Sequence, residues 1–105
     1  VDGISVRAPV ATGSLTDLVV MLGRQTSVEE VNGAFRAAAS GALAGLLQYA
    51  EDPIVSTDIN GSAYSCILDS DLTMVHGSTV KAFGWYDNEW GYSCRLVDLI
   101  PMLLP

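Results

Sequence analysis

The sequence predicts an α+β fold in which a mostly antiparallel β-sheet carries helices packed on one face. Short extended segments outnumber helical ones, with about six or seven strand patterns against two substantial helical patterns. Their order lacks the regular strand and helix alternation that produces a parallel sheet. With 105 residues, half of them apolar, the chain is long enough to bury one core. We therefore expect residues 1–105 to form a single domain.

The first two strands are predicted over residues 3–11 and 15–22. In the first, apolar residues alternate as in a half-buried strand, and Arg7 points away from the apolar side. Pro9 cannot donate to the ladder, so this strand is expected near an edge. The second strand is apolar on both faces and needs cover on both. One cover can be a helix of this chain, and the other has to come from a neighbouring subunit or a missing part of the protein.

The first helix is predicted to begin after Ser27. Ser27 and Glu30 form a capping-box signature, and Glu29 adds a favourable charge near the positive end of the helix dipole. Apolar residues then recur at helical spacing and give the helix a buried stripe. Gly41 is the expected end of this helix.

The centre of the chain is predicted to consist of short strands joined by turns. Asn60-Gly61 is a strong turn signal, and Gly77-Ser78 is a second turn. The predicted strands cover residues 46–50, 54–59, 64–68, 72–75 and 79–85.

The last element is predicted to be a helix that Asp87 or Asn88 caps and that runs through Leu99. Pro101 lacks an amide hydrogen and clashes with the carbonyl of Val97 in a continuing helix. The helix is therefore expected to end or kink at this proline.

The charge of the chain argues against nucleic acid and membrane partners. Twelve acidic and five basic side chains give a net charge of −7, and the basic residues are scattered along the sequence. Such a surface repels nucleic acid and anionic lipid. No apolar run approaches the roughly 20 residues that a membrane-spanning helix needs. Any bound phosphate must be held locally, by one arginine or by backbone amides.

The two cysteines and the single histidine give little indication of a metal site or a catalytic pair. Cys66 and Cys94 are widely spaced, and with one histidine and no CxxC pair they predict no metal site. Reduced thiols in a cytoplasmic protein are favoured over a disulfide. His76 could act as a general base with either cysteine as nucleophile, but nothing local orients the pair, and a histidine at a strand end ordinarily faces solvent.

An aromatic and amide-bearing run, WYDNEWGYS, covers residues 85–93. Its rings favour a packing role in an arbitrary protein. In this chain the run belongs to a longer pattern that resembles the C-terminal part of the catalytic domain of glyceraldehyde-3-phosphate dehydrogenase. The resemblance covers nearly the whole chain, and the segments that carry it are VDGISVRAPV, GSLTDLVVML, TSVEEVNGAFRAAA, LQYAEDPIVSTDI, LDSDLTMVHG and WYDNEWGYSCRLVDLI.

The resemblance implies an oxidoreductase of glycolysis, a cytoplasmic homotetramer. In this family a cysteine thiolate attacks the aldehyde of glyceraldehyde 3-phosphate, hydride passes to NAD or NADP, and inorganic phosphate releases 1,3-bisphosphoglycerate. Arg7 matches the arginine that binds phosphate. Asn88 matches the asparagine that hydrogen-bonds the nicotinamide carboxamide, and Tyr92 matches the aromatic residue beside the nicotinamide.

Other working parts of the family have no counterpart in this sequence. There is no GxGxxG segment of a Rossmann domain and no Ser-Cys-Thr-Thr-Asn run with the nucleophile. The resemblance thus assigns no catalytic residue to residues 1–105, and the isolated chain is expected to be inactive. Two alternatives stay open: a relative that oxidises erythrose 4-phosphate, and a non-catalytic module that serves as an oligomer interface.

Overall fold

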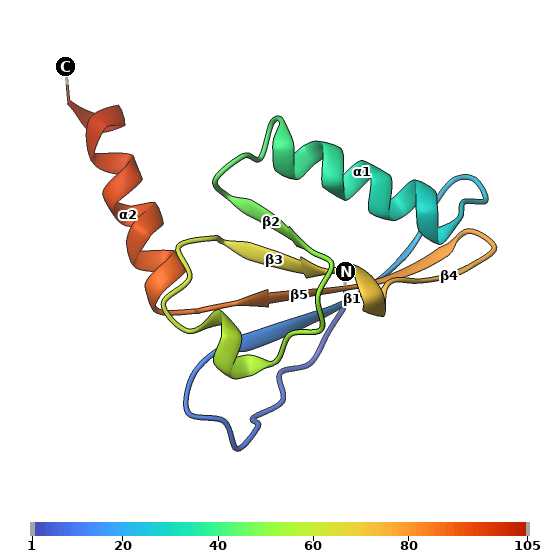
Figure 1. Ribbon diagram of the computed structural model, residues 1–105, viewed down its shortest axis with the longest axis horizontal. Helices are drawn as coiled ribbons and strands as arrows, with labels where there is room; N and C mark the ends of the chain where they lie inside the picture. Colours follow the sequence, from blue (N-terminus) through green and yellow to red (C-terminus); the bar gives the residue numbers. More distant parts are fainter. Residues whose placement is uncertain (1, 105) are drawn as a thin grey trace.

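The computed structural model describes residues 2–104, which form one mixed sheet with two α-helices (Figure 1). The strands follow the order β1-β5-β3-β2, and β4 also pairs with β5. Only β2 and β3 run parallel, whereas the other pairs are antiparallel. The predicted α+β class and mostly antiparallel sheet are therefore confirmed. The elements are β1 (Ser14–Met21), α1 (Val28–Ser40), β2 (Leu47–Ala50), η1 (Ser56–Ile59), β3 (Cys66–Asp69), η2 (Ser70–Leu72), β4 (Met74–His76), β5 (Thr79–Tyr86) and α2 (Trp90–Leu103).

Strand β5 is the centre of the sheet. It pairs along its whole length with β1, from Ser14 opposite Tyr86 to Met21 opposite Thr79. Its other side pairs with β3 near Trp85 and with β4 at the opposite end. Because β5 has partners on both sides, it gives a fixed base to the turn that follows it.

The core lies between the sheet and α1. Leu47, Leu68 and Ala82 come from three strands, and Phe35 and Ala38 of α1 pack against them. This arrangement matches the apolar stripe predicted for the first helix. The predicted ends of that helix are also confirmed. The Ser27 hydroxyl accepts from the Glu30 amide at 3.2 Å, and Gly41 is the C-cap.

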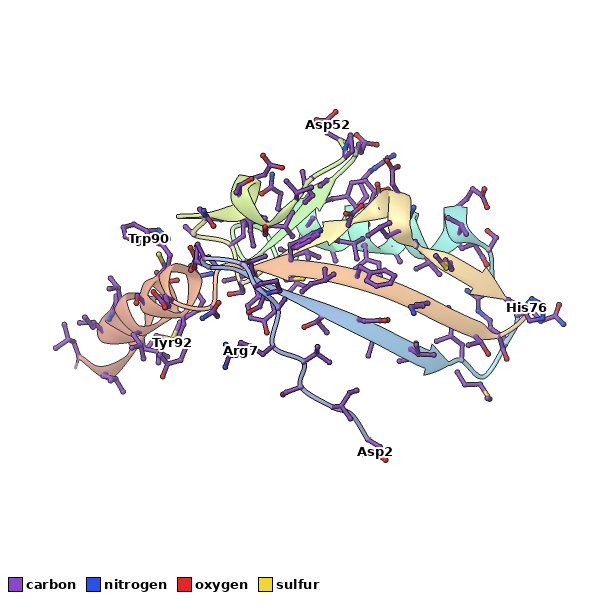
Figure 2. All side chains as sticks on the ribbon, turned by 90° about the horizontal axis from the view of Figure 1, so that it is seen from below. Asp2, Arg7, Asp52, His76, Trp90 and Tyr92 are labelled. Atoms are coloured by element: carbon purple, nitrogen blue, oxygen red, sulfur yellow. The ribbon has the colours of Figure 1, made fainter. Side chains whose placement is uncertain are left out.

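The strand predicted over residues 3–11 is wrong. This segment has no strand structure, and its apolar side chains are exposed, with Ile4 92% accessible. Alternation fits a strand locally, but a strand also needs a partner with free ladder groups, and Pro9 withholds one donor here. Its position can be followed below the sheet in Figure 2.

The strand predicted over residues 54–59 is also wrong, since its second half forms η1. The Asp58 carboxylate accepts a hydrogen bond from the Val55 amide at 2.8 Å and so closes a tight turn. Such side-chain to backbone bonds compete with sheet ladders. The strand predicted at 72–75 begins later, at Met74, because Leu72 belongs to η2.

Helix α2 does not end at Pro101 but continues to Leu103. The proline withholds the hydrogen bond to the Val97 carbonyl, but only Met102 and Leu103 follow it in the helix. Beyond its first turns α2 extends away from the sheet (Figure 1), and Gly91 is its one buried residue. No helix within residues 2–104 is long and apolar enough to cross a membrane.

Candidate functional site

The candidate site is built on the turn between β5 and α2. Asp87 organises this turn from a buried position. Its Oδ1 accepts from the amides of Glu89 at 3.0 Å and Trp90 at 2.8 Å, and its Oδ2 accepts from the amide of Gly61 at 2.9 Å. The N-cap residue Glu89 makes no side-chain bond at the helix start, so Asp87, one of the two predicted caps, binds the first amides in its place. Asp87 also ties the helix to the turn at residues 60–61.

The same hydrogen bonds set the charge state of this carboxyl group. The Trp90 amide, and then the Gly61 amide, lower the pKa of Asp87 from its ordinary value, because they stabilise the carboxylate. At neutral pH the group is ionised, and its negative charge lies near the N-terminus of α2. A charge of this sign is favourable at that end of a helix.

Asn88 follows directly and is exposed. Its Oδ1 accepts a hydrogen bond from the Ser14 hydroxyl at 3.1 Å, although the two residues lie 74 positions apart. Ser14 is the first residue of β1 and pairs with Tyr86 in β5. The amide of Asn88 is thus held from one side by the sheet.

A hollow of about 260 Å³ lies beside this turn. Asn88 and Tyr92 both line it, so the structure brings two of the three predicted binding residues together. An exposed ring next to an amide can stack on a flat heterocycle and bond its polar substituent. The lining residues are Ser65, Tyr86, Asp87, Asn88, Gly91, Tyr92 and Arg95.

Gly91 sets the position of the helix that carries Tyr92. A Cβ atom at this position would lie 2.8 Å from the carbonyl oxygen of Tyr64, which is a backbone atom. Only a glycine therefore allows the first turn of α2 to approach so closely. This contact fixes Tyr92 next to Asn88.

Arg95 is a lining residue that sequence reasoning missed. Its Nε donates to Asp98 at 2.8 Å, and its Nη1 donates to the Ser65 hydroxyl at 3.1 Å. A signal was present in the sequence, because Arg95 follows Gly91 by four positions and Tyr92 by three, which places all three on one helix face.

Arg7 lies outside this hollow. It belongs to the exposed segment before β1, and Figure 2 shows it on that loop, whereas Tyr92 lies on α2. Within residues 2–104 its guanidinium forms no ion pair. The structure thus leaves Arg7 exposed and does not place it at the amide and the ring.

The cysteines and the histidine are separated. His76 lies at the opposite end of the sheet from α2, the helix that carries Cys94 (Figure 2). Both thiols are free, and burial raises the pKa of the Cys66 thiol. A raised pKa disfavours the reactive thiolate. Within the described residues, no three side chains of the metal-binding types cluster together.

Comparison with known proteins supports the resemblance that the sequence motifs carry. The family model described as glyceraldehyde 3-phosphate dehydrogenase, C-terminal domain, matches residues 1–88. The chain belongs to the glyceraldehyde 3-phosphate dehydrogenase family. Recognition from the sequence is thereby confirmed, and the family match reaches as far as Asn88.

Similar proteins extend the match past that point. The chain is 63% identical to glyceraldehyde-3-phosphate dehydrogenase 2 of Streptomyces avermitilis over 99 residues, which are 93% of this chain and 30% of that protein. It is 62% identical over 100 residues to the enzyme of Streptomyces coelicolor, again 93% of the chain and 30% of that protein. The glyceraldehyde-3-phosphate dehydrogenase of Mycobacterium tuberculosis is 53% identical over 102 residues, with 97% of the chain and 30% of that protein covered. The chain thus spans about 30% of the length of these relatives.

Proposed function

We propose that residues 1–105 are the C-terminal portion of the catalytic domain of a phosphorylating aldehyde dehydrogenase, with the Rossmann domain outside this chain. The reaction converts glyceraldehyde 3-phosphate and inorganic phosphate to 1,3-bisphosphoglycerate, with NAD or NADP as hydride acceptor, in the cytoplasm. The observation that carries the proposal is the shared hollow of Asn88 and Tyr92. Membership of the family supports the reaction class.

In this proposal Asn88 and Tyr92 handle the nicotinamide ring. The Asn88 side chain hydrogen-bonds the carboxamide and so decides which ring face is presented. The exposed ring of Tyr92 lies beside the nicotinamide and limits its movement. When bound, the dinucleotide accepts the hydride, and the residues of this chain contribute binding and orientation.

Arg7 is proposed to bind phosphate, either that of the aldehyde substrate or the attacking inorganic phosphate. A guanidinium offers a planar fork of donors that suits an oxyanion. In a chain with a net charge of −7, such a free cation provides a local site in an otherwise repulsive surface.

The direct test uses a full-length enzyme that carries this segment. Asn88→Ala is expected to raise the KM for the dinucleotide about threefold to tenfold, which corresponds to one hydrogen bond. Glu89→Gln is the matched control, since this exposed neighbour lies outside the lining of the hollow. An unchanged KM for the dinucleotide in Asn88→Ala would contradict the proposed hydrogen bond between Asn88 and the carboxamide. Assays with glyceraldehyde 3-phosphate and erythrose 4-phosphate side by side decide between the two aldehydes.

The isolated chain is proposed to be inactive, because hydride transfer needs a bound dinucleotide and a covalent thiol intermediate. No Rossmann motif and no nucleophile motif lies in this sequence. Incubation of the chain with aldehyde, phosphate and NAD should give no absorbance of NADH. Turnover above the buffer rate would overturn this statement.

A second role, that of an oligomer interface, is favoured by the uncovered face of the sheet. Leu15, Val19 and Met21 of β1 share one face, and Val19 is 58% exposed. Asp17 on that face forms an ion pair with Lys81 at 3.0 Å. Within residues 2–104, α1 packs on the other face of the sheet, over β2, β3 and β5. Most side chains of β1 remain exposed to solvent. We propose that copies of the protein pack here, in a homotetramer as in the family.

The oligomer proposal predicts a change of assembly in Val19→Lys. A charge in a buried apolar contact is unfavourable, so the variant should dissociate into smaller species. Light scattering after gel filtration measures the mass, and Gln25→Lys in an exposed loop is the control. A tetramer that persists in Val19→Lys would assign the interface to another surface.

A further inference from the structure

The side chains of Ser14 and Asn88 form a hydrogen bond between the start of β1 and the turn before α2. The Ser14 hydroxyl donates to Oδ1 of Asn88 at 3.1 Å. This is the one hydrogen bond of the Asn88 side chain within residues 2–104. With its oxygen engaged, the amide keeps both N–H donors of Nδ2 free.

The serine is itself fixed from two sides. On one side, Ser14 belongs to a ladder of eight pairs between β1 and the central strand β5. On the other side, Gly13 enters the strand with φ of +93°, and a Cβ there would lie 2.9 Å from Cδ1 of Ile59, which is fully buried. The strand ladder therefore holds Ser14, and the residue before it has a conformation and surroundings that suit glycine.

The backbone of Asn88 is fixed independently. Asp87 binds three amides around it, those of Gly61, Glu89 and Trp90. With the backbone held by Asp87 and one lone pair of the side-chain oxygen occupied by Ser14, the amide nitrogen offers both of its donors to a ligand. A donor of this kind recognises an acceptor, such as a carbonyl oxygen.

We propose that Ser14 is a positioning residue that orients the Asn88 amide so that Nδ2 donates to the carbonyl oxygen of the nicotinamide carboxamide. This inference rests on the proposed cofactor contact of Asn88. Ser14 lies 74 positions before Asn88 in the sequence. In this arrangement Asn88 binds the oxygen of the carboxamide and not its nitrogen. The opposite orientation would make Asn88 an acceptor for the carboxamide nitrogen.

The first test compares variants of a full-length enzyme that carries this segment. Ser14→Ala should raise both the dissociation constant of the dinucleotide, measured by calorimetry in the absence of aldehyde, and its KM about threefold to tenfold, because a binding contact is weakened. The value of kcat should stay within about twofold. Ser14→Thr keeps the hydroxyl and should restore the wild-type KM. Thr16→Val, which removes a hydroxyl from the same strand, is the control and should leave the cofactor KM unchanged.

The second test reads the polarity of the contact with the acetylpyridine analogue of the same dinucleotide. The analogue keeps the carbonyl oxygen and replaces the amide nitrogen with a methyl group. If Asn88 donates to the oxygen, Asn88→Ala and Ser14→Ala should raise KM by the same factor for the analogue as for the natural cofactor. If the factor falls to one with the analogue, Asn88 accepts from the nitrogen and the inference is overturned.

The outcomes separate this inference from the proposed function. An unchanged KM in Asn88→Ala removes the cofactor contact and the role of Ser14 with it. A raised KM in Asn88→Ala together with an unchanged KM in Ser14→Ala keeps the contact and refutes the positioning role. If Ser14→Ala does not fold, Ser14→Cys, which has a weaker donor, replaces it and should show an intermediate KM. A wild-type KM in Ser14→Cys would then refute the role.

Discussion

The turn before α2 and the segment before β1 carry the proposed binding residues in opposite ways. Around Asn88, one buried carboxylate binds three backbone amides, and a serine from a distant strand holds the side chain. Around Arg7, the chain is exposed and has no regular structure. In the first region, contacts within residues 2–104 hold the Asn88 side chain. Arg7 has no ion-pair partner within residues 2–104.

Asp87→Ala should cause the largest loss of stability, because it removes the bonds that order the turn before α2. The variant loses a helix cap and a bond to Gly61, and bonds to a charged acceptor are worth more than neutral ones. We expect a loss of about 3 kcal/mol in the free energy of unfolding of a full-length enzyme, measured by urea titration. Glu89→Ala is the control, and equal losses in both variants would show that Asp87 has no special part.

Gly91→Ala should be the next largest. The added methyl would meet the Tyr64 carbonyl oxygen at 2.8 Å, so the first turn of α2 must move. Overpacking of this kind costs about 1–3 kcal/mol. The cofactor KM should rise at the same time, since Tyr92 moves with the helix. Gly33→Ala in α1, where nothing lies within 4 Å, is the matched control and should not destabilise the protein.

A pH titration sharpens the role of the Asp87 charge. The hydrogen bonds lower the pKa of Asp87 in the folded protein below its ordinary value of 3.8. The ionised carboxylate therefore stabilises the fold fully above about pH 4, and this stabilisation is lost as the pH falls through the lowered pKa. The stability difference between wild type and Asp87→Asn should therefore shrink below about pH 4. Urea titrations of both proteins from pH 7 to pH 3 measure it, and a constant difference would contradict the assignment.

Arg7→Ala should have the smallest effect on stability, and it tests the exposed segment before β1. An exposed side chain without an ion pair contributes within about 0.5 kcal/mol. The KM for inorganic phosphate or for the aldehyde phosphate should nevertheless rise, because the fork of donors is lost. Arg24→Ala, at another exposed arginine, is the kinetic control. A large drop in stability with unchanged kinetics would make Arg7 a structural residue.

The parts of the fold that the sequence predicted are those set by local chemistry. The cap at Ser27 and the end at Gly41 depend on neighbouring residues. The strand predicted over residues 79–85 is β5, whose buried and half-buried residues alternate. The strand predicted over residues 3–11 failed because pairing is decided by a partner far along the chain. The same reason hid Ser14, whose contact with Asn88 spans 74 positions.

The candidate site was predictable to a similar extent. The motif placed Asn88 and Tyr92 four positions apart, and the structure confirms that they line one hollow. Asp87 was named only as one of two possible caps, and its bond to Gly61 had no signal in the sequence. Arg7 belongs to the same family pattern but lies apart in this chain, and its role remains a prediction.

The close approach at Gly91 gives α2 a pivot at one end. The helix rises about 1.5 Å per residue, so Leu103 lies about 18 Å from Gly91 along its axis. A swing of about 10° at this pivot carries the far end through about 3 Å, whereas the Cα atom of Tyr92, about 3.8 Å from that of Gly91, moves by about 0.7 Å. A contact at the outer end of α2 therefore displaces that end several times further than the backbone that carries Tyr92.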